Sequence, residues 1–212
     1  MRPPPILRRF LVATLVACSV LSGTVLASGA AVASPRAAPD QLVREVTQRI
    51  VTLADAGLPA AQREREIDRL LADSVAVERL ARAVLGRHWR TADASQRERF
   101  SSLLAPYLRA TYGNRLGEAA GYRLELGQPR PISAGDMMVP GKAARDDGAP
   151  IAVDWRVTQT PEGWRILDVL VEGVSMALTW RNEFDSVIGR AGMDGLLAEM
   201  SRRVEQRMAA TS

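Results

Sequence analysis

The chain has 212 residues, of which 47% are hydrophobic and 25% are charged, a balance typical of globular proteins. Three of its 28 basic residues and none of its acidic residues lie before residue 34, so the formal charge of +4 overstates the charge of the remainder. Residues 34–212 carry 25 basic and 24 acidic side chains, a net charge of +1, which gives no global basis for nucleic-acid binding. With one His and one Cys, metal sites built from several such ligands are excluded.

The first 33 residues have the layout of a secretory signal peptide. A short basic start, residues 1–9, is followed by an apolar run over 10–26 and by the small residues Ala31, Val32 and Ala33. This order predicts export with cleavage near Ala33, and residues 34–212 then form one domain. Two alternatives stay open, a retained membrane anchor and lipidation of Cys18 at the lipobox-like segment 15–18.

The first half of the exported chain has helical periodicity. Asp40 is expected to cap a helix with an apolar stripe, and residues 61–73 and 75–85 predict two more helices. Asp93 and Gln96 have the spacing of a capping box, with Ser95 and Glu98 as the alternative pair. A long helix is expected to follow, carrying an internal proline that predicts a kink. The stripe of the first helix is Leu42, Val43, Val46, Ile50 and Leu53, and that of the long helix runs from Phe100 to Leu116 around Pro106.

From Tyr122 the apolar period changes to two, which predicts strands. Residues 122–126 and 136–139 are expected to be strands, and the polar segment 142–150 is expected to be a loop. Residues 151–157 and 164–171 flank the turn residues 160–163 and predict a β-hairpin. Ser175 is suited to cap a helix over 175–190, and a last helix is expected over 193–207.

Helices, then strands, then helices indicate an α+β fold with an antiparallel sheet of about four strands and about six or seven helices in a single domain.

The sequence contains no convincing catalytic arrangement, so we expect neither an enzyme nor a cofactor. The segment 172–176 has a Gly before its Ser but none after it, and the glycine-rich phosphate-binding motifs are absent. His88 adjoins Trp89 at a helix end, where a structural role is the ordinary one. Asp154 and Asp168 lie one on each hairpin strand, and solvated or Arg-paired strand charges are their ordinary interpretation.

Several segments, in this order along the chain, carry a family resemblance. LGRHWRTADASQRERF (85–100), the later Tyr107 and Tyr112, WRILDVLVEGVSMALTWRNEF (164–184) and GMDGLLAEM (192–200) together resemble MlaC-type periplasmic phospholipid-binding proteins, also called toluene-tolerance auxiliary proteins. The closest likeness is to the hopanoid-associated, HpnM-like branch. The resemblance implies a strongly twisted antiparallel sheet wrapped by helices, with an apolar cavity for lipid.

A lipid carrier needs apolar walls, because burial of acyl chains supplies most of its affinity at about 0.8 kcal/mol per CH₂ group. Ordinary core packing is the competing interpretation of such strand faces. Arg181, after the sheet, is a weak candidate for contact with a lipid headgroup. The expected lining consists of Met137, Val139, Val153, Trp155, Val157, Leu167, Val169, Val171, Val174 and Met176.

The resemblance implies a periplasmic carrier of phospholipid, or of a hopanoid-type lipid. Its implied partners are an inner-membrane MCE-type ABC transporter complex and an outer-membrane lipoprotein–porin complex, in the maintenance of outer-membrane lipid asymmetry. An accessory role in hopanoid biosynthesis or transport, and a docking module with a filled core, are the two alternatives.

Overall fold

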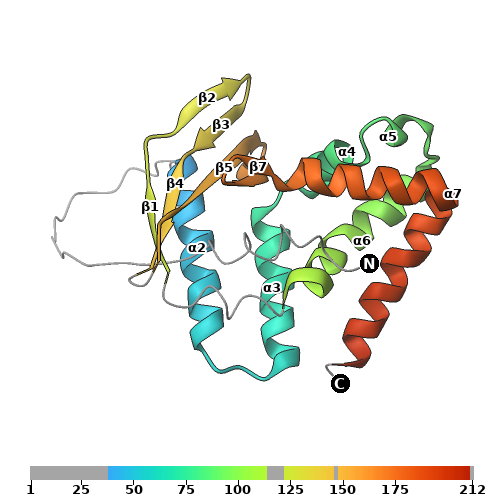
Figure 1. The fold of residues 1–212 in the computed structure, drawn as a ribbon, viewed down its shortest axis with the longest axis horizontal. Helices are drawn as coiled ribbons and strands as arrows, with labels where there is room; N and C mark the ends of the chain where they lie inside the picture. The colour runs from blue at the N-terminus through green and yellow to red at the C-terminus, as the bar shows by residue number, and fades with distance from the viewer. Residues whose placement is uncertain (1–37, 114–121, 146–147, 211–212) are drawn as a thin grey trace, which may run out of the picture.

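The computed structural model describes residues 38–113, 122–145, 148–210, in which six helices and seven strands are formed (Figure 1). The predicted signal peptide, its cleavage near Ala33, the lipidation alternative at Cys18 and the end of the apolar stripe at Leu116 lie outside these residues. The helices are α2 (Pro39–Asp55), α3 (Ala60–Ser74), α4 (Val77–Leu85), α5 (His88–Thr91), α6 (Ala94–Tyr112) and α7 (Met176–Ala209).

The helix boundaries agree with the predicted caps at two places and differ at a third. Asp93 accepts a hydrogen bond from the Gln96 backbone N–H and forms the predicted capping box at the start of α6. Ser175 caps α7 by accepting from the Leu178 N–H at 3.0 Å. The prediction that Asp40 caps the first helix is wrong, because Pro39 already occupies the first helical turn and Ala38 is the N-cap.

The sheet is antiparallel, with β5 at its centre, as the α+β prediction required. Strand β6 pairs with one side of β5, while β3 and β4 pair with successive halves of its other side. The strands are β1 (Arg123–Leu126), β2 (Arg130–Ser133), β3 (Asp136–Val139), β4 (Gly141–Ala144), β5 (Ile151–Thr160), β6 (Gly163–Val171) and β7 (Val174–Ser175).

The strand count exceeds the expected four, and part of the expected loop over 142–150 is strand β4. Its pairing explains why the segment looked like a loop. A Cβ added to Gly141 would lie 2.8 Å from the Val153 carbonyl oxygen, so the close approach of β4 to β5 requires glycine. Small and turn-forming residues here serve close backbone packing, and a pattern based on large apolar side chains cannot detect such a strand.

The predicted hairpin is confirmed, with one irregularity in β6. Arg156 pairs with Asp168 and the next residue, Val157, pairs with Ile166, so Leu167 is an extra residue. After such a bulge, the alternation of side chains between the two faces of the sheet is shifted by one residue. Accordingly Ile166, Val169 and Val171 pack on one cluster, whereas Leu167 joins another.

The two predicted C-terminal helices form the two arms of α7, which bends at Gly192 with φ 71° and ψ 177° (Figure 1). Side chains gather in two clusters. The sheet region consists of the sheet with α2 and α3, and the helical region consists of α4, α6 and α7 with Leu167. Val75 packs on both.

Candidate functional site

One face of the sheet carries most of the predicted apolar lining. Val153, Trp155 and Val157 alternate along β5 and are buried, and Val139 on β3 lies opposite Trp155. Val171 on β6 lies opposite Val153 and is also buried. Because opposed residues on antiparallel strands point to the same side, these residues form a continuous apolar floor across three strands.

Helix α2 covers this floor, a role that the sequence analysis did not assign to it. Leu42, Val43, Val46 and Thr47 are its buried residues, and the helix contacts β3 and β6, the strands on either side of β5. Figure 1 shows α2 lying against the sheet with α3 beside it. The i, i+3, i+4 stripe was the available signal, but periodicity alone cannot say which sheet face a helix covers.

Half-buried apolar residues surround the buried floor. Met137 and Val169, both predicted as lining, lie among them on β3 and β6. An apolar surface that is closed at its centre and partly open at its edge offers contact to long hydrocarbon chains. The other residues of this rim are Ile50, Val51, Val75, Leu124, Leu126, Ile151 and Trp164.

Three predicted lining residues lie elsewhere. Leu167, the bulge residue, packs with the helical region. Val174 on β7 is 45% exposed, and Met176 is buried at the start of α7. The sequence pattern could not separate them from the floor, because the bulge and the turn after β6 change the direction of the chain.

Two polar groups of this interior have no hydrogen-bond partner. The Trp155 Nε1 atom and the Thr47 Oγ1 atom are buried without a partner in the part of the chain that the structure describes. The two residues are only 3% and 4% exposed. Leaving a buried donor unsatisfied costs about 1–3 kcal/mol, so each of these groups needs a physical explanation.

Arg181, the headgroup candidate, has a structural contact. Its Nε atom donates to the Ala83 carbonyl oxygen at 2.7 Å, near the end of α4. Its side chain also passes close to Gly86, where a Cβ would lie 3.0 Å from the Arg181 Nε atom. These contacts join α7 to α4 in the helical region.

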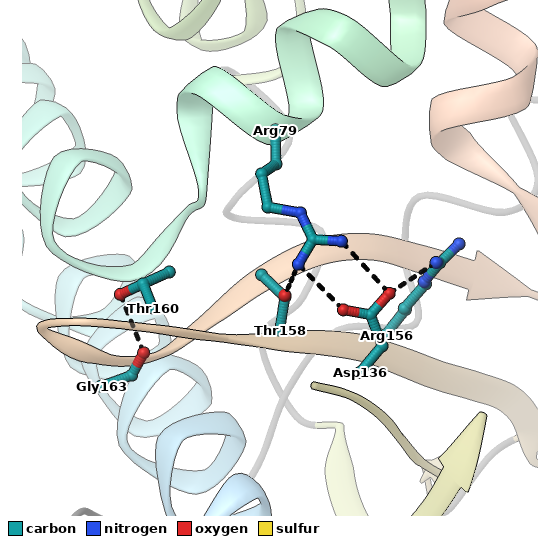
Figure 2. Close-up of polar contacts among 6 residues, drawn as sticks. All are labelled: Arg79, Asp136, Arg156, Thr158, Thr160 and Gly163. Carbon is teal, nitrogen blue, oxygen red and sulfur yellow. Dashed lines mark hydrogen bonds and ion pairs between the residues drawn. The ribbon is translucent and has the colours of Figure 1, made fainter. Parts of the chain in front are cut away.

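A buried carboxylate organises two other arginines on the opposite face of the sheet. Asp136 is 1% exposed and accepts from Arg79 at 3.0 Å and from Arg156 at 2.6 Å (Figure 2). Arg79 reaches down from α4 and also donates to the Thr158 hydroxyl. Burial by itself would raise the pKa of Asp136, but hydrogen bonds from Arg156 and Thr158 and the charge of Arg79 bring it below its ordinary value.

Asp168 also faces this side of the sheet, opposite Arg156, and caps α7 by accepting from the Ala177 N–H at 2.9 Å. Asp168 thus holds the start of α7, whereas Asp136, with its two guanidinium groups, ties α4 to the sheet. Asp154 accepts from the Gly141 N–H at 3.3 Å. Each of the two hairpin carboxylates thus has a structural role.

A separate pocket of about 230 Å³ lies between α6 and the last turns of α7. Its lining is polar and charged, which does not suit hydrocarbon chains. Among the described residues, no cluster of three or more His, Cys, Asp or Glu side chains is arranged to hold a metal ion. Within the same residues, none of the helices has the length and apolar character needed to span a bilayer. The pocket is lined by Tyr107, Thr111, Glu199, Arg202, Arg203 and Gln206.

The model of the MlaC protein family matches residues 40–202, which include the whole sheet and both clusters. The chain belongs to the MlaC family. A solved structure with the same fold is that of the phospholipid-binding protein from Ralstonia solanacearum, determined in complex with a phospholipid. It superposes with a TM-score of 0.69 at 21% sequence identity, over 80% of this chain and 98% of that chain.

The first segment that carried the resemblance to MlaC proteins, residues 85–100, joins helices of the helical region. Within it, His88 Nε2 lies 2.7 Å from Asp185 Oδ1, which joins α5 to α7. Hydrogen bonding to His88 and the charge of Arg87 lower the pKa of Asp185. The guanidinium groups of Arg82 and Arg97 lie 5.3 Å and 5.8 Å from the centroid of the Trp89 ring. The structural role expected for His88 agrees with these contacts, whereas the assignment to the hopanoid-associated branch stays a prediction.

Proposed function

We propose that the protein binds a phospholipid and holds its acyl chains between the apolar floor of the sheet and helix α2. The observation that carries this proposal is the floor itself, apolar across β3, β5 and β6, covered by one amphipathic helix and bordered by half-buried apolar side chains. Membership of the MlaC family and the phospholipid in the Ralstonia solanacearum structure support a lipid-binding protein rather than an enzyme.

Tail burial can supply the affinity without a dedicated headgroup site. At about 0.8 kcal/mol per buried CH₂ group, two long chains can outweigh the cost of association. Val139, Val153 and Val157 are closed to water. Entry of a lipid therefore requires α2 to move away from the sheet, and the lipid tails replace part of its apolar contact.

We further propose that the protein works in the periplasm as a carrier between two membranes. It would receive lipid from one complex and release it to another, the two complexes being the MCE-type ABC transporter of the inner membrane and the lipoprotein–porin complex of the outer membrane. Binding mainly through the acyl chains would suit such a carrier, because lipid could then be exchanged at either membrane without a dedicated headgroup site.

The direct test is to express the full chain with its N-terminal segment, purify it from the periplasmic fraction and record native mass spectra with lipid extraction. We expect a complex with one phospholipid. A hopanoid mass in its place would favour the alternative lipid, and a protein that carries no lipid and takes none from vesicles would overturn the proposal.

Val169→Trp tests where the lipid lies. Val169 lies half-buried opposite Trp155, so a larger ring there fills space beside the floor. We expect at least a tenfold loss of lipid occupancy in native mass spectra. Leu178→Trp is the matched control, because Leu178 is 52% exposed on α7 and the same ring is added outside the site. Equal lipid loads in two folded variants would argue against this position.

A further inference from the structure

The Trp155 indole is an isolated hydrogen-bond donor in an apolar interior. An indole nitrogen can only donate, so it needs an acceptor oxygen within about 3 Å. Its neighbours on the floor, Val139 and Val169, have no side-chain acceptor, and the described part of the chain provides no partner.

Thr47 contributes a second unpartnered group from the helix that covers the floor. Its hydroxyl belongs to the buried stripe of α2 and, although a helical threonine can bond to the carbonyl four residues earlier, it does not do so here. The remaining unpartnered buried atoms among the described residues, Ser101 Oγ and Arg156 Nε, belong to half-exposed side chains. The two deeply buried residues with an unpartnered polar atom thus both belong to the sheet region, one on β5 and one on α2.

We propose that Trp155 and Thr47 form a polar anchor for the ester linkage of a diacyl glycerophospholipid, with the indole N–H donating to an ester carbonyl oxygen. This inference rests on the proposed function. Hydrocarbon chains have no acceptor, and the ester carbonyl is the acceptor closest to where the chains begin. The anchor fixes how deep the lipid sits, because the carbonyl must lie at the level of Trp155 on the central strand β5.

An ordered water molecule is the competing partner for these groups. A buried water makes about two to four hydrogen bonds, and the two unpartnered side-chain groups here supply at most the minimum. The two explanations differ in their chemistry: an ester contact depends on the lipid's carbonyl, and a water contact does not.

The experiment compares two phospholipids with the same headgroup and chain lengths, one with ester and one with ether linkages, in competition for delipidated full-length protein by native mass spectrometry. Since one hydrogen bond contributes about 0.5–1.5 kcal/mol, we expect a preference of roughly three- to tenfold for the diester. Trp155→Phe, which keeps an aromatic ring and removes the N–H, should lose most of the preference, and Thr47→Val should reduce it by less.

Trp180→Phe is the matched control, because the Trp180 N–H already donates to the Tyr112 hydroxyl oxygen at 3.0 Å in the helical region. This variant should keep the full preference. With lipid ¹³C-labelled at the ester carbonyl, the infrared carbonyl band of the bound lipid should shift down in the parent protein and return in Trp155→Phe.

The outcomes separate the anchor from the function on which it rests. Binding of both lipids with equal affinity by the parent protein, or an unchanged preference in a folded Trp155→Phe variant, overturns the anchor and leaves phospholipid binding intact. Failure of the parent protein to bind either lipid overturns the proposed function itself.

Discussion

Trp180 of the helical region and Trp155 of the sheet region differ in whether the indole N–H has a hydrogen-bond acceptor. In the helical region, Phe184 makes edge-on contacts with Phe100 and Tyr107 at centroid distances of 5.6 Å and 5.8 Å, and Trp180 donates to Tyr112. In the sheet region, Trp155 is more deeply buried and donates to nothing in the described chain. A tryptophan donor that already has an acceptor needs no further partner, whereas a buried one without an acceptor is suited to a ligand.

We therefore propose that the helical region supplies stability and the sheet region supplies binding. Phe184→Ala tests the first assignment. Removing this ring from a fully packed aromatic cluster should lower the free energy of unfolding by about 3–5 kcal/mol. Urea denaturation measures it, and the loss should be the same with and without bound lipid, since the cluster lies in the helical region.

A loss below about 1 kcal/mol for Phe184→Ala would mean that the helical region is as loosely packed as a binding site. A loss that depends on lipid would mean that the ligand contacts both regions. Either result would contradict the assignment of stability to the helical region and binding to the sheet region.

The Asp136 cluster ties the two regions together and offers a test through pH. Asp136→Asn should cost about 2 kcal/mol at neutral pH, less than a fully buried ion pair because the Arg79 and Arg156 side chains are 47% and 40% exposed. The pKa of Asp136 in the folded protein lies below its ordinary value of 3.8. Its contribution is therefore fully present above that value and is lost as the pH falls through the lower, folded-state pKa.

Denaturation curves of Asp136→Asn and the parent protein should consequently converge in acid, while they differ at pH 7. Glu162→Gln serves as a comparison and should show a much smaller effect of the same sign, because the hydrogen bond from Thr160 also lowers the pKa of this exposed carboxylate at the hairpin turn. A constant difference between Asp136→Asn and the parent from pH 7 to strong acid would show that the carboxylate charge is not what ties α4 to the sheet.

Much of this division could be predicted from the sequence, because period-2 and i, i+3, i+4 patterns report directly which side chains are buried. The alternation of Val153, Trp155 and Val157 located the floor, and Ser175 and Asp93 located two helix starts. The capping and hairpin signals are local, so nearby residues suffice to read them.

The remainder depends on contacts between distant segments. Leu167 does not lie with the other predicted lining residues, because a one-residue bulge changes its direction and the sequence carries no signal for that bulge. Strand β4 was not predicted, because Gly141 is required by the nearby Val153 carbonyl oxygen rather than by a turn. The missing partner of Trp155 also needs coordinates, since a sequence cannot show which donors lack acceptors.

The smallest expected effects, those of replacing Trp180 or Trp155 by Phe, compare the two tryptophans directly. Trp180→Phe should lower stability by about 1 kcal/mol through loss of one hydrogen bond, equally in lipid-free and lipid-loaded protein. In lipid-free protein, Trp155→Phe loses ring volume but also removes an unsatisfied N–H, so these changes partly offset. With diester lipid bound, Trp155→Phe should lower the free energy of unfolding by about 1 kcal/mol more than in lipid-free protein. The reason is that the variant loses the hydrogen bond to the lipid, and with it that part of the stability that the lipid adds. Calorimetry of both variants in both states measures these differences, and an identical cost for Trp155→Phe in the two states would place its N–H outside the lipid contact.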